Sequence, residues 1–247
     1  MTVLGDEDLY VRGCRTALAA WEQYAHATDG AALHRLPGVS AAVFPNGPER
    51  AVYNNAILDG ELSATGRAGA LDAMHAVYVE AGIDDYAAWV HESDIAMRAD
   101  LERRGYAVHE TTRAMGMATA AVRVPRPHLD LAPADWAEHL RVNDLPPDLL
   151  AGVDASAFHL PIARLDGENV AAAMAYDADG DCGVYNVGTL ERARRHGLGT
   201  ALTALLVHDA ADRGCRTASL QSTAMAERVY AAVGFKDLGR ILEYVRV

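Results

Sequence analysis

Residues 191–200 read Glu-Arg-Ala-Arg-Arg-His-Gly-Leu-Gly-Thr, and this stretch lies between a predicted strand at residues 183–189 and a predicted helix at residues 199–213. Its two glycines permit a tight turn and remove Cβ atoms, so an anionic ligand can approach the main-chain N–H groups. The first N–H groups of the helix lack intrahelical acceptors and lie at the positive end of its dipole. With the hydroxyl of Thr200 and the neighbouring arginines, they predict a site for a pyrophosphate.

The segments around this stretch alternate between strand and helix patterns. Asp166-Gly167 predicts a tight turn between two strands. Gly214 and Gly234 stand where two amphipathic runs should end as helices. The expected strands are 162–165, 170–176, 183–189, 217–221 and 238–245, and the expected helices are 199–213 and 224–233. The alternation predicts an α/β unit with a mixed sheet.

The chain also repeats itself. Three matches occur in the same order, with offsets that drift from 132 to 129 residues: 52–58 with 184–190, Ala70-Leu71 with Ala201-Leu202, and 101–106 with 230–235. A helix is expected at residues 8–27, and a short helix at 134–142 inside the proline-rich stretch 122–148. We therefore predict two copies of one unit, at residues 1–122 and 134–247, joined by a linker at 123–133.

Two nucleotide-binding alternatives fit the stretch 191–200 poorly. A dinucleotide-binding fold needs an acidic residue at the end of the next strand, and that strand ends at Leu220-Gln221-Ser222. The third glycine of its motif is absent as well. A Walker loop needs Gly-Lys-Ser or Gly-Lys-Thr, which the sequence lacks. A nucleotide-dependent oxidoreductase is therefore disfavoured.

The pattern Arg-x-x-Gly-x-Gly after a strand resembles the signature of the GCN5-related N-acetyltransferases, the GNAT superfamily. Val187-Gly188-Thr189 before the loop and Tyr230-x-x-x-Gly234-Phe235 after it strengthen the resemblance, which covers about the last 85 residues. It implies two tandem GNAT-like units, each a mixed, mostly antiparallel sheet flanked by helices. It also implies an acetyl-CoA-dependent N-acetyltransferase, which moves the acetyl group to a primary amine by direct attack in a ternary complex.

The resemblance assigns roles to particular residues. The backbone of Val187, Gly188 and Thr189 pairs with the pantetheine arm, as an added strand would. The pyrophosphate loop comprises Arg194, Arg195, His196, Gly197, Leu198, Gly199 and Thr200. Tyr230 is the acid that protonates the leaving thiolate, because a phenol has an ordinary pKa near 10 and suits a thiolate better than a carboxylic acid does.

Some family features are missing. Thr223 stands where family members often have Asn, and the strand 183–189 offers Tyr185 and Asn186 but no carboxylate base. The general base stays open between water and His159. Without a base, a non-catalytic acyl-CoA-binding or regulatory module is the alternative function.

The first copy has lost the residues that carry this chemistry. Thr65-Gly66-Arg67-Ala68 aligns with His196-Gly197-Leu198-Gly199, so one glycine is gone, and Ser63 replaces Arg194. Leu101 stands in place of Tyr230 and has no proton to donate. We expect this half to be structural, with no productive cofactor site.

Composition sets the remaining expectations. The formal net charge of −12 disfavours nucleic acid as a partner, and no apolar run is long enough for a membrane span. The three scattered cysteines and the histidines show no metal-ligand spacing, so we expect no metal and a cytoplasmic protein. The expected partner is a small-molecule or peptide amine, and the chain is a monomer or homodimer.

Overall fold

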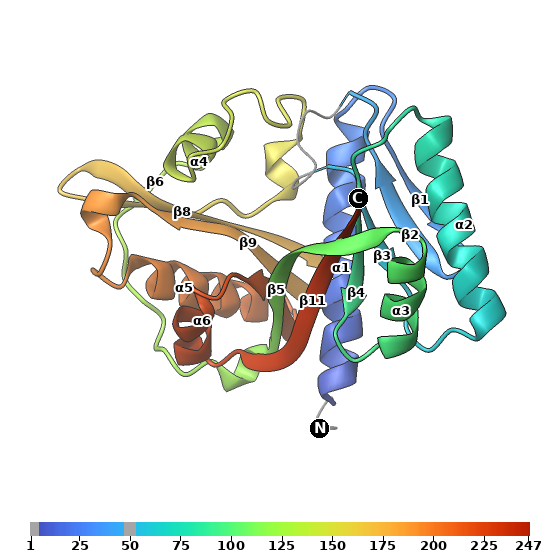
Figure 1. The fold of residues 1–247 in the computed structure, drawn as a ribbon. Helices are drawn as coiled ribbons and strands as arrows, with labels where there is room; N and C mark the ends of the chain where they lie inside the picture. The colour runs from blue at the N-terminus through green and yellow to red at the C-terminus, as the bar shows by residue number, and fades with distance from the viewer. Residues whose placement is uncertain (1–4, 47–52) are drawn as a thin grey trace. The chain divides into compact units, whose positions relative to one another are not determined.

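The computed structural model describes residues 5–46 and 53–247 (Figure 1). They form two compact units with alternating chain segments. The C-terminal unit comprises the described residues up to Ala17 and Ala114–Leu238, and the N-terminal unit comprises Leu18–Arg113 and Gly239–Val247. Three elements have residues in both: α1 (Asp6–His26), β5 (Tyr106–Ala118) and β11 (Lys236–Arg246). Residues 123–133 belong to the C-terminal unit, and the linear division into 1–122, 123–133 and 134–247 stays a prediction.

In the N-terminal unit, the sheet order is β1-β2-β3-β4-β11. Only the β3–β4 pair is parallel among the pairs of these five strands. The core includes Tyr78, Met97, Leu101 and Tyr244, which are all buried. Of the repeat segment 52–58, Val52 lies outside the described residues. The elements are β1 (Ala32–Leu36), β2 (Val39–Val43), β3 (Asn55–Leu58), α2 (Ala64–Glu80), β4 (Ala87–His91) and α3 (Ile95–Arg103).

In the C-terminal unit, the sheet order is β5-β10-β9-β8-β7-β6. The strands from β6 to β9 are antiparallel to their neighbours, and β9 and β10 are parallel. The elements are β6 (Leu131–Ala132), α4 (Trp136–Val142), β7 (Ile162–Leu165), β8 (Glu168–Ala178), β9 (Asp181–Thr189), α5 (Leu198–Asp212), β10 (Thr217–Ser222) and α6 (Glu227–Val233).

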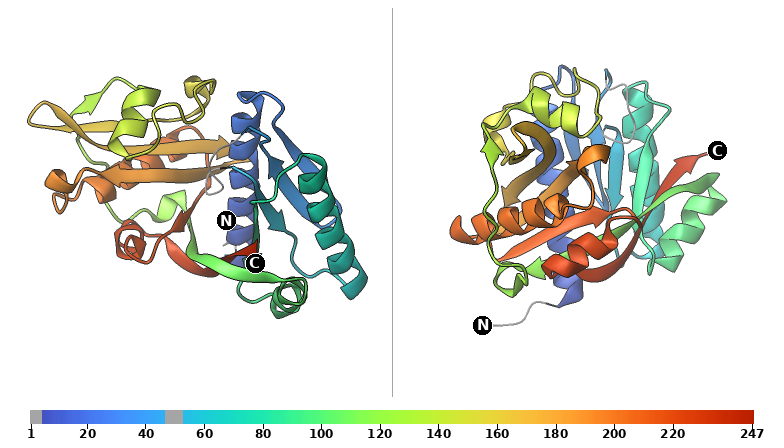
Figure 2. Two further views of the ribbon diagram at one scale, coloured as in Figure 1. Left: turned by 45° about the horizontal axis from the view of Figure 1, so that its top comes forward. Right: turned by 90° about the vertical axis from the view of Figure 1, so that its left-hand side faces the viewer.

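The alternation of side chains along β8 decides which helix covers which face of this sheet. Ala171, Ala173 and Ala175 belong to the apolar core that contains the buried face of α5, whereas Ala172 packs with Val142 of α4. Successive strand residues point to opposite faces, so α4 and α5 lie on opposite sides of the sheet (Figure 2). This arrangement leaves the end of β9 between two helical layers.

The observed elements confirm the fold class expected from the sequence: an α/β protein with a mixed, mostly antiparallel sheet. Asp166 and Gly167 have φ angles of 52° and 81°, as a tight turn between β7 and β8 requires. Helix α6 begins at Glu227 rather than at residue 224, because a turn precedes it, closed by a hydrogen bond from the Ala226 N–H to the Thr223 carbonyl (3.0 Å).

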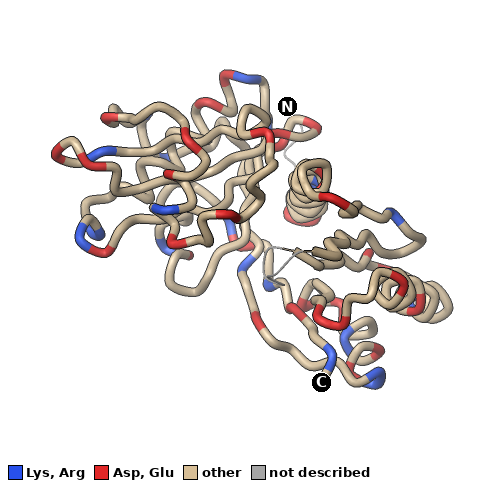
Figure 3. Tube along the Cα trace, turned by 90° about the horizontal axis from the view of Figure 1, so that it is seen from above, with Lys and Arg blue, Asp and Glu red and all other residues tan. Residues whose placement is uncertain are grey.

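Charged residues are spread along the whole trace rather than gathered in one segment (Figure 3). The excess of acidic residues therefore does not mark a site by itself. Among the described helices, none has the length and apolar character needed to cross a membrane.

Candidate active site

The loop between β9 and α5 builds an anion site from backbone geometry. Arg195 and Gly197 both have positive φ angles, 67° and 77°. Gly197 is the N-cap of α5, and no described side chain caps this end of the helix. The Ala201 N–H donates to the Gly197 carbonyl (2.9 Å), so the helix begins here with the N–H groups before Ala201 at its positive end. The glycine at this position allows the left-handed backbone at little cost.

Strand β9 carries a bulge close to this loop. Ala172 pairs with Gly188 and Met174 with Tyr185, so β9 has one residue more than β8 in the interval. Within it, Asn186 has a φ angle of 47°. A bulge leaves its extra residue outside the ladder of hydrogen bonds. Backbone groups of β9 are therefore released just before Val187.

The strands β9 and β10 diverge on the other side of the bulge. Their parallel pairing covers Thr217 to Ser219 against Asp181 to Gly183, yet β9 continues to Thr189 and β10 to Ser222. Two parallel strands that separate at their carboxyl ends leave room for an extended group between them. Val187, Gly188 and Thr189 lie in the part of β9 beyond this pairing.

A cavity of about 700 Å³ occupies this opening. Every residue predicted to bind the cofactor lines the cavity except His196, and Tyr230 lines it too. The exposed ring of His196 has its Nδ1 atom near the carbonyl oxygens of Ala193 (3.2 Å) and Arg194 (3.1 Å). The lining residues among the predicted set are Val187, Gly188, Thr189, Arg194, Arg195, Gly197, Leu198, Gly199, Thr200 and Tyr230.

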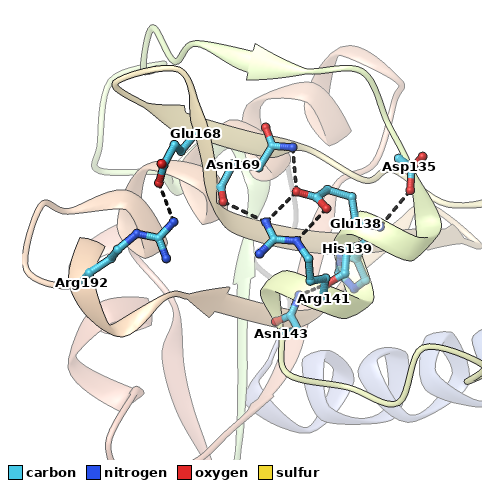
Figure 4. A network of polar contacts seen from close by, with 8 residues as sticks. All are labelled: Asp135, Glu138, His139, Arg141, Asn143, Glu168, Asn169 and Arg192. Carbon is cyan, nitrogen blue, oxygen red and sulfur yellow. Dashed lines mark hydrogen bonds and ion pairs between the residues drawn. The ribbon is translucent and has the colours of Figure 1, made fainter.

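Some arginines around the cavity are paired with carboxylates of the protein, and others are not. Arg192 pairs with Glu168 (2.6 Å), and Arg141 donates to both oxygens of Glu138 (Figure 4). In contrast, the described structure gives neither Arg194 nor Arg195 a carboxylate partner. Arg194 donates one hydrogen bond, from Nε to the Thr189 carbonyl (3.4 Å), and both exposed guanidinium groups can face an anion at the N-terminus of α5.

Helix α4 closes the opposite wall and is held on β8 by the network in Figure 4. Asp135 caps the helix by accepting from the Glu138 N–H (2.8 Å). Glu138 also accepts from the Asn169 side chain (2.7 Å), and Arg141 donates to the Asn169 carbonyl (3.1 Å). Hydrogen bonds from Arg141 and Asn169 lower the pKa of Glu138 to about 2. The position of α4 is thus fixed by charged hydrogen bonds.

The end of α4 brings Asn143 and Asp144 to the cavity, which the sequence did not predict. A Cβ atom at Gly188 would overlap with Asn143 Oδ1, so any larger residue at this position would displace the Asn143 side chain. The exposed Asp144 supplies a carboxylate that the cavity-lining end of β9 lacks, and Glu191 is another carboxylate in the lining. The contact between Asn143 and Gly188 joins residues 45 positions apart. Local sequence pattern gives no signal for it.

Tyr230 reaches the cavity from α6 and is only 8% exposed. Burial raises the pKa of its hydroxyl to about 12, so the phenol is protonated at neutral pH.

His159, which the sequence analysis considered as a general base beside water, is not part of the cavity lining. Its Nε2 atom lies 3.5 Å from Asp177. No group of three or more potential metal ligands occurs among residues 5–46 and 53–247.

The corresponding helix of the N-terminal unit begins differently. Ser63 caps α2 by accepting from the Gly66 N–H (3.1 Å), and Arg67 is paired with Asp100 (2.6 Å). Strand β3 has four residues and stays in register with β2 as far as Leu58. A side chain therefore occupies the first turn of α2, whereas Gly197 offers none at the start of α5.

Comparisons with known proteins agree with this geometry. The family model described as "Acetyltransferase (GNAT) family" matches residues 126–235. The chain contains a GNAT domain. The domain is that of an acyltransferase. No curated protein matches the sequence.

Several solved structures share the fold over nearly the whole chain. A GCN5-related N-acetyltransferase from Kribbella flavida has a TM-score of 0.69 at 17% identity, with 94% of each chain covered. One from Sphaerobacter thermophilus has a TM-score of 0.57 at 15% identity, with 96% of this chain and 92% of that one covered. A glucosamine N-acetyltransferase region of a fungal multi-domain β-N-acetylglucosaminidase has a TM-score of 0.58 at 15% identity, with 83% and 31% covered. At these identities the likeness establishes the fold alone.

Proposed function

We propose that this protein transfers the acetyl group of acetyl-CoA to a primary amine by direct attack in a ternary complex. The observation that carries the proposal is a single cavity lined by the uncapped start of α5, the end of the bulged strand β9 and the hydroxyl-bearing residue Tyr230. Each supports a different part of the same reaction: binding of an anion, binding of an extended amide and transfer of a proton.

The cavity fits acetyl-CoA by size and by chemistry. The N–H groups at the start of α5, with Arg194 and Arg195, would hold the pyrophosphate. The open end of β9, from Val187 to Thr189, would pair with the pantetheine amides. A volume of about 700 Å³ lies within the usual range for sites that hold organic ligands, roughly 300–1,000 Å³. Acetyl-CoA supplies an acyl group on a thiol that can leave.

In the proposed reaction, the amine nitrogen forms a bond to the thioester carbonyl carbon and the carbon–sulfur bond breaks. Backbone N–H groups released by the bulge at Asn186 and Val187 stabilise the negative charge on the carbonyl oxygen. Tyr230 donates its proton to the departing sulfur, and the nitrogen loses one proton to a base. Holding both reactants in one cavity removes much of the entropic barrier to the encounter.

We assign the base to Asp144, acting directly or through one water molecule. It is the carboxylate that lines the cavity from the α4 wall, away from the arginines of the pyrophosphate loop. A negative charge there also attracts a protonated amine, which must lose a first proton to become nucleophilic before it loses the second as the amide forms. Small amines, amino sugars and peptide N-termini are the acceptors to test; an amino sugar is included because one structural neighbour is described as a glucosamine N-acetyltransferase.

The N-terminal unit has a structural role in this proposal, as a degenerate second copy without a productive cofactor site. The capped start of α2 and the buried aliphatic Leu101 at the position of Tyr230 support it. Cytoplasmic location, and a monomer or homodimer as the functional form, belong to the same proposal.

Release of free thiol from acetyl-CoA tests the function against a panel of amines. We expect one class of amine to give turnover and Tyr230→Phe to lower kcat by about 100-fold or more, the usual scale for a general acid, with acetyl-CoA affinity unchanged. The alternative, a non-catalytic acyl-CoA-binding or regulatory module, draws on the absence of a carboxylate from residues 183–189 of β9. It requires tight binding without turnover on any amine and no effect of Tyr230→Phe.

A further inference from the structure

The N-terminal unit contains a second cavity, of about 240 Å³, that the acetyl-transfer site does not use. Its walls come from one face of α2, the junction of α3 with β5, and the end of β11. The lining residues are Leu71, His75, Arg104, Tyr106 and Arg246. All of them belong to the same compact unit.

The proposed alignment of the two copies allows this lining to be compared with the same positions of the C-terminal unit. At the offsets found in the sequence, the four lining residues outside β11 align with Leu202, Leu206, Val233 and Phe235. These four are buried members of the apolar core of the C-terminal unit. A leucine, a valine and a phenylalanine at packing positions are thus replaced by His75, Arg104 and Tyr106. Replacing apolar side chains by polar ones at a cavity lowers stability unless the polar groups form hydrogen bonds, either within the protein or with a ligand.

A chain of hydrogen bonds fixes the polar groups at the cavity wall. The His75 Nδ1 atom lies 3.1 Å from the Tyr86 hydroxyl, which lies 2.5 Å from the Tyr106 hydroxyl. Tyr78 stacks on the ring of Tyr86 with centroids 4.1 Å apart. With Tyr86 donating to Nδ1, the Nε2 atom of His75 carries the proton and is a donor. Preorganised donors of this kind bind a ligand without first having to be ordered.

Two guanidinium groups complete the lining in a protein whose net charge is −12. Arg104 is held in place by Asp72 (2.5 Å) and by the Ala68 carbonyl (3.3 Å). For the Arg246 guanidinium, the described part of the chain shows no ion pair or side-chain hydrogen bond, and its positive charge acts on Tyr86. An arginine presents a planar fork of N–H donors that matches a carboxylate or a phosphate. One anchored and one available arginine therefore face a small polar cavity.

From these observations we infer that the N-terminal unit binds a small organic or inorganic oxyanion, carrying a carboxylate or a phosphate group, between Arg246, Arg104 and His75. The volume of about 240 Å³ is too small for a coenzyme and suits a ligand below the drug-sized range. The apolar Leu71 side chain contacts any carbon skeleton the anion carries. This site is independent of the acetyl-transfer proposal, since none of its residues lines the larger cavity.

Calorimetric titration with inorganic phosphate and with succinate, at constant ionic strength, tests the site. The protein used carries Arg194→Gln and Arg195→Gln, so that the loop before α5 does not bind phosphate. We expect saturable binding of at least one anion, with the stronger of the two identifying the group recognised. Arg246→Gln should weaken it by about tenfold, as expected for loss of a charged hydrogen bond.

Two further variants separate the site from general electrostatics. Tyr106→Phe, which introduces the residue found at the equivalent position of the C-terminal unit, should also weaken binding because it removes a hydroxyl while keeping the ring. Arg103→Gln is the matched control, because Arg103 is exposed and next in sequence to Arg104 but is not part of the lining. The inference fails if neither anion binds saturably, or if Arg103→Gln weakens binding as much as Arg246→Gln does.

Discussion

His139 on α4 offers a perturbation whose effect on stability can be worked out from the structure. Its side chain is fully buried and stacks on Trp136, with ring centroids 5.7 Å apart. Neither ring nitrogen has a hydrogen-bond partner among the described residues. Burial lowers the pKa of His139 from 6.5 to about 4, so the ring is neutral in the folded protein under most conditions. The unfolded chain takes up a proton at this position at a higher pH.

The direction of the pH dependence follows from that difference. Between the two pKa values the unfolded state binds a proton that the folded state does not, so stability falls as the pH is lowered through this range. Two pKa values of 6.5 and about 4 give a loss of about 2 kcal/mol between pH 8 and pH 5. His139→Phe should remove this loss. It should also add roughly 1 kcal/mol or more at all pH values, because two unpaired buried nitrogens disappear.

Urea unfolding of the wild type and of His139→Phe, at several pH values from 8 to 5, measures both effects. The quantity to compare is the difference between the two free energies of unfolding at each pH, since all other titrating groups cancel. His128→Phe, which replaces an exposed histidine of the same unit, is the control and should show no such difference. A difference that does not grow toward pH 5, or a variant less stable than the wild type, would refute the reasoning.

Two predictions concern the proposed active site. Gly197→Ala forces a residue with a side chain into a φ of 77°, which costs about 1–2 kcal/mol, so acetyl-CoA affinity measured by calorimetry should fall about tenfold. Gly214→Ala, with a φ of 98° away from the cavity, should leave affinity unchanged. Asp144→Asn should lower kcat by about tenfold or more with acetyl-CoA affinity intact, while Asp148→Asn, outside the lining, should act like wild type.

Much of the fold could be predicted because its signals are local. The turn at Asp166-Gly167, the helix ends at Gly214 and Gly234 and the N-terminal cap of α4 at Asp135 each depend on residues a few positions apart. The tight turn before α5 was also predictable, because a glycine such as Gly197 adopts a positive φ at little cost. Strand β7, expected at residues 162–165, has those bounds in the structure.

What the sequence did not predict depends on contacts between distant segments. The approach of Asn143 to Gly188 depends on the packing of α4 on β8. No residue near Asn143 in the sequence indicates that Gly188 is its contact. The same holds for the final strand: its residues Ile241–Val245 pair with β4, about 150 positions earlier, although their local pattern shows only that they are extended. The bulge at Asn186 left one signal that could have been used, because asparagine tolerates a positive φ better than most residues.

Calorimetric titration of acetyl-CoA into the 247-residue protein tests the central claim most directly. We predict saturable binding at one site per chain, abolished or strongly weakened by the double change Arg194→Gln and Arg195→Gln. The matched control is Arg192→Gln, whose guanidinium is already paired with Glu168. Absence of any binding heat with acetyl-CoA would contradict the assignment of the cavity. Two sites per chain would contradict the claim that only the C-terminal unit holds the cofactor.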